Sequence, residues 1–160
     1  MKIIVIDGHN LIPKLPRINL KDLDDESQLI GLIQEYCRLA RKQAELFFDG
    51  APNPINSIRK GGLVRAHFIR VGHSADDSII AYLQRNGKNA RNMLVITSDR
   101  RIQTEAKNLG AELMTSESFA QEIKRVLSSP IAVQELKEKI PSAGEVEEWI
   151  HLFDQKTGKK

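Results

Sequence analysis

Short apolar runs alternate with longer amphipathic segments along most of the chain, a pattern typical of a sheet covered by helices. The run Lys2–Ile6 is apolar at every position after the lysine, as expected of a strand buried on both faces. We predict further strands at residues 45–50, 63–71, 93–97 and 111–114. Buried strands of this kind favour a mostly parallel sheet of about five strands.

Apolar residues at helical spacing separate or follow the predicted strands. These stripes fall within residues 29–40, 79–83, 102–109 and 119–127. Regular alternation of strands and helices places helices on both faces of a parallel sheet. The sequence therefore predicts an α/β fold, a three-layer α/β/α sandwich.

Residues beyond Pro130 also look helical. They carry a capping box, Ser142–Glu145, followed by an apolar stripe at Val146, Trp149, Ile150 and Phe153. A length of 160 residues fits one hydrophobic core better than two. We assign residues 1–129 to one α/β domain and residues 130–160 to a C-terminal helical extension packed on the same domain.

Composition narrows the class of protein. Cys37 is the only cysteine, so an intramolecular disulfide and a Cys-rich zinc site are excluded, and its place on an apolar stripe predicts helix packing. The apolar run at the amino terminus is too short for a signal peptide or a membrane span, so we expect a cytoplasmic protein that has no membrane partner. The sequence contains neither GxGxxG nor a GK[ST] loop, and we expect no nucleotide cofactor.

Charge is distributed unevenly along the chain, although the net charge is only +3. Between Gly50 and Ser98 the only acids are Asp76 and Asp77, whereas seven basic residues lie in the same stretch. Such a stretch favours an anionic partner such as RNA, although a solvated strand-and-loop face is the alternative. Our candidates for holding the RNA backbone, in a segment that no acid interrupts, are Arg59, Lys60, Arg65 and Arg70.

Carboxylates follow the predicted strands or begin the helix after one of them. Asp7, Asp49 and Asp99 come at strand ends, and Asp76 lies in the first turn of a helix. Because ligands of parallel sheets collect at the carboxyl ends of the strands, we expect these side chains to meet at one edge. Clustered carboxylates repel one another unless a cation neutralises them, and Mg²⁺ or Mn²⁺ prefers oxygen ligands. The pattern predicts a Mg²⁺ or Mn²⁺ site.

Each carboxylate also has a structural alternative. Asp99 could cap the following helix, and Asp7 and Asp49 could close turns with the glycines after them. With Ser74 as N-cap, Asp77 takes the position of the acid in a capping box. That role leaves Asp76 unexplained, so we rank it above Asp77 as a metal ligand and keep Asp77 as an outer candidate.

Two side chains near the acids are weaker candidates. Asn10 could orient water, a metal ligand or a phosphate oxygen through its amide, or could instead form a turn. His9 and His73 adjoin acidic positions, but we assign neither of them a catalytic role.

Four segments together resemble the NYN branch of the PIN-like nuclease superfamily, in particular its bacterial YacP-like group. They are Ile4–Ile12, Phe47–Gly50, Ser74–Asp77 and Val95–Asp99, in the order and at the approximate spacing of that family. One departure is His9, where the family commonly has tyrosine, at a position expected to line the site.

This resemblance implies a PIN-like sheet and endonucleolytic cleavage of single-stranded RNA. It also implies metal-binding carboxylates at Asp7, Asp76 and Asp99, with support from Asn10 and with Asp49 further out. Some relatives act on ribosome-associated messenger RNA, which makes the ribosome a candidate partner.

Two other functional classes remain open. A non-catalytic RNA- or ribosome-binding module would keep the fold and some acids, and would bind RNA without divalent ions and never cut it. A phosphotransfer or phosphatase domain would also place acids at strand ends. Asp7 lacks a second aspartate two residues later, and no lysine lies near the final strand motif, which disfavours that class.

Overall fold

A computed structural model of the chain describes residues 1–16, 25–52 and 57–130. Its sheet has six strands in the order β3-β4-β2-β1-β5-β6, and every neighbouring pair is parallel except β3 with β4. The strands are β1 (Ile3–Asp7), β2 (Gln43–Ala51), β3 (Ser57–Gly61), β4 (Val64–Arg70), β5 (Met93–Ile96) and β6 (Glu112–Met114). The predicted mostly parallel sheet is confirmed.

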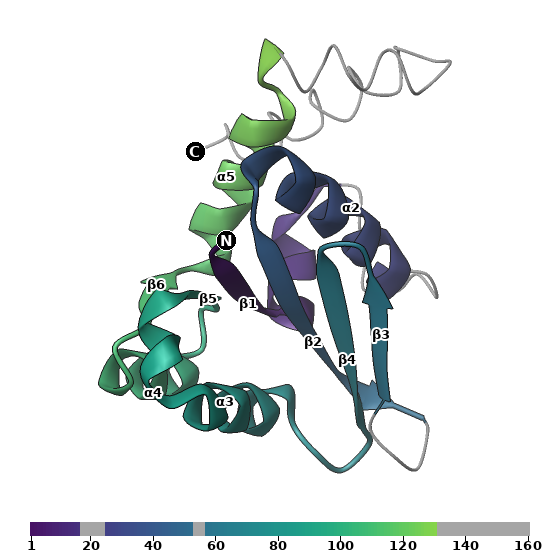
Figure 1. The fold of residues 1–160 in the computed structure, drawn as a ribbon. Coiled ribbons are helices and arrows are strands. Elements are labelled where there is room, and N and C mark those ends of the chain that lie inside the picture. The colour runs from purple at the N-terminus through teal and green to yellow at the C-terminus, as the bar shows by residue number, and fades with distance from the viewer. Residues whose placement is uncertain (17–24, 53–56, 131–160) are drawn as a thin grey trace.

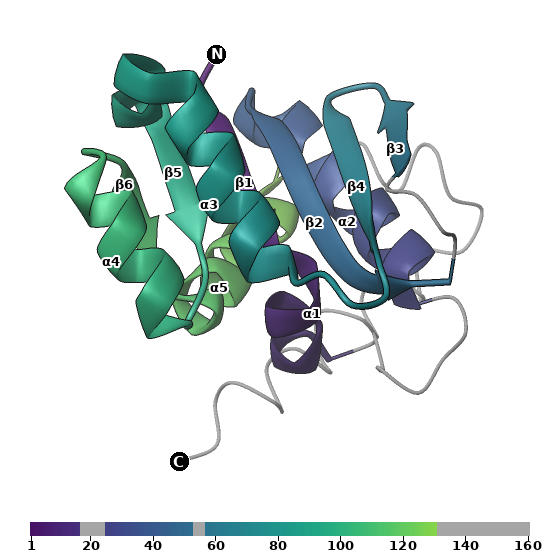
Figure 2. The same ribbon diagram turned by 90° about the horizontal axis from the view of Figure 1, so that it is seen from below.

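Helices cover both faces of this sheet (Figures 1 and 2). They are α1 (Gly8–Leu11), α2 (Asp25–Ala40), α3 (Ala75–Asn86), α4 (Arg100–Asn108) and α5 (Ser116–Leu127), with 3-10 turns η1 (Ile12–Lys14) and η2 (Gly87–Asn92). One core packs α2 and α5 against the sheet, and the other packs α3 and α4. The three-layer prediction is therefore confirmed.

The central strand β1 explains the two cores. Ile4 and Ile6 belong to the core beneath α2 and α5, whereas Val5 belongs to the core beneath α3 and α4. All three are fully buried, as the unbroken apolar run predicts. Because side chains of β1 are buried in a core on each face of the sheet, its polar side chains are expected only at its ends.

Strand β3 was not predicted, since we expected no strand between those at residues 45–50 and 63–71. All five of its residues are exposed, so the hydrophobic pattern offers no signal for it. It pairs antiparallel with β4 across a tight turn in which Gly62 adopts a φ of 57°. The sheet thus ends on the exposed strand β3 rather than on β4.

The predictions for residues 130–160 concern almost entirely residues outside the described ranges. They include the helical extension, the capping box at Ser142 and the stripe that contains Trp149. Among the described helices, none is both long and apolar enough to cross a membrane.

Cys37 is fully buried on α2, and its burial raises the pKa of the thiol to about 12. Because the thiolate is the reactive form, we expect iodoacetamide at pH 8 to alkylate the native chain roughly 100-fold or more slowly than the chain in urea. The measurement is a mass-spectrometric time course. Equal rates in the two conditions would contradict the burial.

Candidate active site

The carboxyl edge of the sheet contains a topological switch point. From β1 the chain continues to β2 and β4 on one side, and it later returns to β5 and β6 on the other. Clefts that bind ligands form at such points in parallel sheets. Asp7 ends β1, and Thr97, Ser98 and Asp99 directly follow β5, so both sides of the switch point carry polar groups. Figure 2 shows α1 and the β4–α3 connection at this edge, opposite the amino terminus.

Close packing fixes the corner after β1. A Cβ added to Gly8 would lie 2.4 Å from the Phe48 ring and 3.0 Å from the Phe47 carbonyl oxygen. Only glycine fits there without displacement of the ring, so α1 can begin directly after Asp7. The backbone thereby holds the Asp7 carboxyl group at the edge.

The surroundings of Asp7 disfavour its ionised form. Only 7% of the residue is exposed, and burial raises its pKa to about 6, helped by the negative charges of Asp76 and Asp49. The backbone amide of Asn10 opposes this shift. A buried carboxylate that faces other carboxylates is stabilised by a nearby cation.

The negative charges of Asp76, in the first turn of α3, and Asp99, the N-cap of α4, interact. Burial raises the pKa of Asp76, and the charge of Asp99 adds to the effect, while Arg101 opposes it. Asp99 also caps α4, because its Oδ1 accepts a hydrogen bond of 3.1 Å from the Ile102 amide. The capping alternative for Asp99 is thus present, and it occupies one carboxylate oxygen.

Asp77 differs from Asp76 in its surroundings. Ser74 caps α3 as predicted, its hydroxyl accepting a 3.1 Å hydrogen bond from the Asp77 amide. The Asp77 side chain is 64% exposed and pairs with Arg101, which lowers the Asp77 pKa. Asp77 therefore already has a cation, whereas Asp76 shares its electrostatic environment with Asp99 and Asp49.

The Asp49 carboxylate contacts the His9 imidazole. Its Oδ1 lies 2.9 Å from His9 Nδ1, and His9 Nε2 lies 2.8 Å from Glu26 Oε2. Burial lowers the His9 pKa, but the two carboxylates outweigh it and raise the pKa above its usual value. The imidazole also packs on the Phe48 ring at 5.3 Å. His9 thus joins α1, β2 and α2 beside the acids. The sequence spacing gives no signal for the contact with Glu26.

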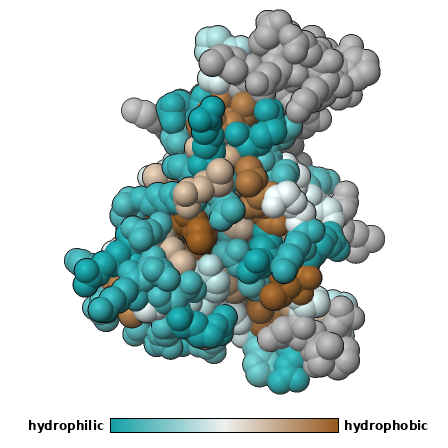
Figure 3. Space-filling view, viewed as in Figure 1, coloured by the Kyte–Doolittle hydropathy of each residue, from teal (hydrophilic) through white to brown (hydrophobic). Residues whose placement is uncertain are grey.

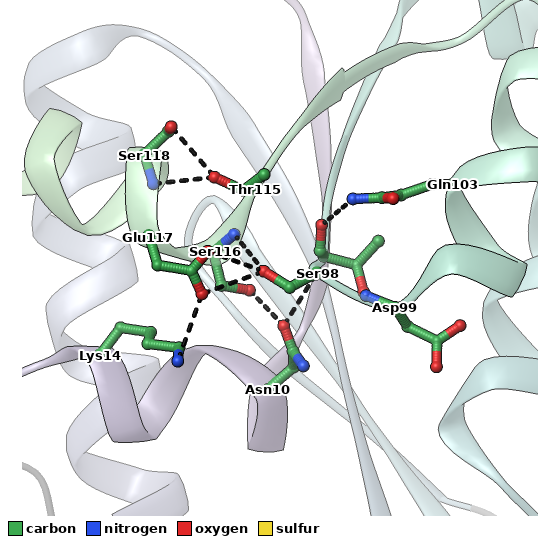
Figure 4. Close-up of polar contacts among 10 residues, drawn as sticks. Asn10, Lys14, Ser98, Asp99, Gln103, Thr115, Ser116, Glu117 and Ser118 are labelled. Carbon is green, nitrogen blue, oxygen red and sulfur yellow. Dashed lines mark hydrogen bonds and ion pairs between the residues drawn. The ribbon is translucent and has the colours of Figure 1, made fainter.

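Asn10 fastens the loop that carries Asp99. Its side-chain oxygen accepts a 2.9 Å hydrogen bond from the Ser98 amide and another from the Ser116 hydroxyl (Figure 4). The Ser98 hydroxyl lies 3.1 Å from Glu117, which pairs with Lys14 at 3.2 Å. Sequence reasoning missed Ser98, Ser116 and Glu117, because Asn10 and Ser116 are 106 residues apart.

Because the Asn10 oxygen takes both hydrogen bonds, the orientation of its amide is determined. Figure 4 shows the nitrogen pointing away from Ser98 and Ser116. The amide NH₂ is therefore not used in the hydrogen bonds with Ser98 and Ser116.

We expect Asn10→Ala to lower the free energy of unfolding by about 1–3 kcal/mol, because the Ser98 amide and the Ser116 hydroxyl lose their acceptor. Urea denaturation measures the change. Asn89→Ala, at an exposed position of η2, is the control and should stay within about 0.5 kcal/mol of the parent chain. Equal stability of the two variants would contradict the fastening role.

A family model described as the YacP-like NYN domain matches residues 4–150. The chain belongs to the YacP-like NYN family. Two solved structures of Rae1 (YacP) from Bacillus subtilis are similar to it. One has 22% identity and a TM-score of 0.69, covering 97% of this chain and 94% of that one. The W164L mutant has 21% identity and a TM-score of 0.65, covering 99% and 96%. No curated protein matches the chain significantly.

Membership of the YacP-like NYN family assigns the chain a nuclease-type function related to RNA. The family match includes all four segments on which the resemblance rested, so His9 lies within it. In this YacP-like domain His9 is a bridge between two acids rather than an exposed ring.

In this YacP-like domain, the four predicted basic residues lie at different ends of the sheet. Arg70 lies at the carboxyl edge, paired in register with Ala51, and Arg59 packs over the Phe68 ring at 5.2 Å. Lys60 and Arg65 face each other at the opposite end of the sheet. These two residues therefore lie away from the carboxyl edge that carries the acids, and the predicted contact of all four with the RNA backbone stays a prediction. Arg101, which we did not select, is the arginine beside Asp77.

The donor set fits a hydrated hard cation. Within residues 1–16, 25–52 and 57–130, no three His, Cys, Asp or Glu side chains form a ready-made metal cluster. The acids instead interact through their charges, Asp7 with Asp76 and Asp76 with Asp99. Mg²⁺ binds through one or two carboxylates and keeps several waters, so direct contact with every acid is not required.

Proposed function

We propose that the chain is a divalent-metal-dependent endoribonuclease that hydrolyses phosphodiester bonds of single-stranded RNA. The observation that carries this proposal is the electrostatic coupling of Asp7, Asp76 and Asp99 at the switch point of a YacP-like domain. Asp7 is buried and Asp76 is partly buried, and neighbouring carboxylates raise the pKa of both, which costs stability and favours a functional role for the cluster.

Asp7, Asp76 and Asp99 are the proposed ligands of Mg²⁺ or Mn²⁺, and Asp49 and Asp77 lie outside them. When bound, such an ion neutralises the acids and the charge that develops on the leaving oxygen. Asp99 presents the carboxylate oxygen that the α4 cap does not use. His9 holds Asp49 in place, and Arg101 keeps Asp77 ionised at the rim.

The side chains also orient the substrate. The Asn10 NH₂ group donates to a phosphate oxygen while its carbonyl oxygen fixes the Ser98 loop. Water is the attacking group, and no side chain needs to form a covalent intermediate. The resemblance extends the proposal to a cytoplasmic enzyme that acts on messenger RNA at ribosomes.

The test is incubation of the purified full chain with a 5′-labelled single-stranded RNA in MnCl₂, MgCl₂ or EDTA. We expect internal cuts with either metal and none in EDTA. A chain that binds the RNA equally well in EDTA and leaves it intact in every metal would overturn the proposal in favour of the non-catalytic module. Asp76→Asn protein, purified identically, controls for contaminating nucleases.

A further inference from the structure

A cavity of about 410 Å³ lies between α3 and the β3–β4 hairpin. Its size is within the range of small-molecule sites. Figure 2 shows why it exists, since α3 lies in front of the centre of the sheet and no described helix covers β4 and β3 on that side. The unpredicted strand β3 thus extends the sheet past α3 and supplies a wall of the cavity.

The strand wall of the cavity carries apolar side chains among polar ones, and the first turn of α3 forms one end. Ile58 of β3 is 54% exposed, and the buried Ile69 and Phe47 lie beside it. Figure 3 shows an apolar patch low in the view, over the lower part of the sheet. Ser74 and Asp77 line one end of the cavity, and the proposed ligand Asp76 lies between them in sequence.

The wall formed by β2 and β4 is held in place by side-chain contacts. His67 stacks on Phe47 with ring centroids 4.2 Å apart and planes 6° apart, and its Nε2 lies 2.7 Å from Glu45 Oε1. Both His67 and Glu45 are only 8% exposed. A wall fixed in this way loses little conformational freedom when a ligand binds.

The other end of the cavity is basic. Arg85, in the last turn of α3, is exposed, lines the cavity and forms no ion pair with any residue in the described part of the chain. Burial raises the pKa of Tyr82, and the charges of Arg65 and Arg85 both oppose that rise. From Asp76 to Arg85 the helix rises about 14 Å.

We propose that this cavity binds a base of the RNA strand next to the scissile bond and that Arg85 contacts the phosphate beyond it. A nucleotide combines a flat apolar base with an anionic phosphate, and the cavity offers the apolar side chains of Phe47, Ile58 and Ile69 on its strand wall and the cation of Arg85 at one end. This inference rests on the proposed function and identifies which part of the surface the substrate follows.

The test compares Arg85→Gln with Arg91→Gln, an equal charge change at an exposed position that is not in the cavity. RNA affinity is measured in EDTA by fluorescence anisotropy, with salt titrations, and cleavage is measured in MnCl₂. We expect Arg85→Gln to weaken binding roughly tenfold and to reduce the salt slope by about 0.7, as for one lost phosphate contact. Its KM should rise while kcat changes little. Equal effects of the two substitutions would overturn the inference.

A second variant tests the cavity itself. Ala81 lines it, and Ala81→Trp should fill it and weaken binding of a long RNA. A shorter RNA that lacks the nucleotide proposed to occupy the cavity should bind Arg85→Gln, Ala81→Trp and the parent chain with equal affinity. A tryptophan variant with native circular dichroism and unchanged affinity would contradict the site. Absence of cutting by the parent chain would overturn the proposed function alone, because the measurements in EDTA do not require catalysis.

Discussion

Asp7→Asn and Asp76→Asn are each expected to lower Mn²⁺-dependent cleavage of single-stranded RNA by about 100-fold or more. Each change removes a negative charge from the proposed metal site and leaves a side chain of nearly the same shape. Asp7 is buried, and the charge of Asp76 interacts with that of Asp99, so both belong to the proposed metal site. Single-turnover rates with a 5′-labelled RNA measure the loss.

Two further variants calibrate that result. Glu112→Gln makes the same charge change at the other end of the sheet, where Glu112 pairs with Lys2, and should leave the rate unchanged. Asp77→Asn should cost less than about tenfold, because Asp77 is exposed and already neutralised by Arg101. Undiminished cutting by both Asp7→Asn and Asp76→Asn would reject the site, and a larger loss for Asp77→Asn would reverse our ranking of the two neighbours.

Asp7→Asn is expected to stabilise the metal-free protein. The Asp7 pKa is about 6 in the folded chain, against 3.8 for the unperturbed group. Between these values the folded state holds a proton that the unfolded state has lost, so the free energy of unfolding falls as the pH rises from about 4 to about 6. At pH 7.5 in EDTA, the substitution should therefore raise the free energy of unfolding by up to about 3 kcal/mol.

The matched comparison is with Asp77→Asn. The pKa of Asp77 is lowered by Arg101 and Ser74, so its ionised form stabilises the fold and its neutralisation should destabilise the protein. MnCl₂ should raise the melting temperature of the parent chain and should do so much less for Asp7→Asn. Urea titrations at pH 4.5 and pH 7.5 measure both signs. Destabilisation by Asp7→Asn at pH 7.5 without metal would contradict the account of the buried acid.

Local pattern was enough to predict the parts of the fold that lie near the acids. The run Ile3–Ile6 predicted a strand buried on both faces, and parallel strands bring their carboxyl ends to one edge. The charges of Asp7, Asp76 and Asp99 interact at that edge for this reason. The capping rule likewise separated Asp77 from Asp76, because an N-cap at Ser74 depends only on neighbours in sequence.

Features that depend on long-range pairing were not predictable from the pattern. Strand β3 has no buried residue, so only its pairing with β4 makes it a strand. The same pairing places Lys60 beside Arg65, at the end of the sheet opposite the acids. The hydrogen bond from Ser116 to Asn10 and the contact of His9 with Glu26 each join elements that only the folded sheet brings together.

The central claim is that Asp7, Asp76 and Asp99 bind a divalent cation at the switch point between β1 and β5. Its most direct test is anomalous X-ray scattering from a crystal of the full chain soaked in MnCl₂. We predict a manganese peak among these three carboxylates in the parent chain and a lost or much weaker peak in Asp7→Asn crystals soaked identically. A parent crystal with manganese bound only elsewhere, or with none bound at millimolar MnCl₂, would contradict the claim.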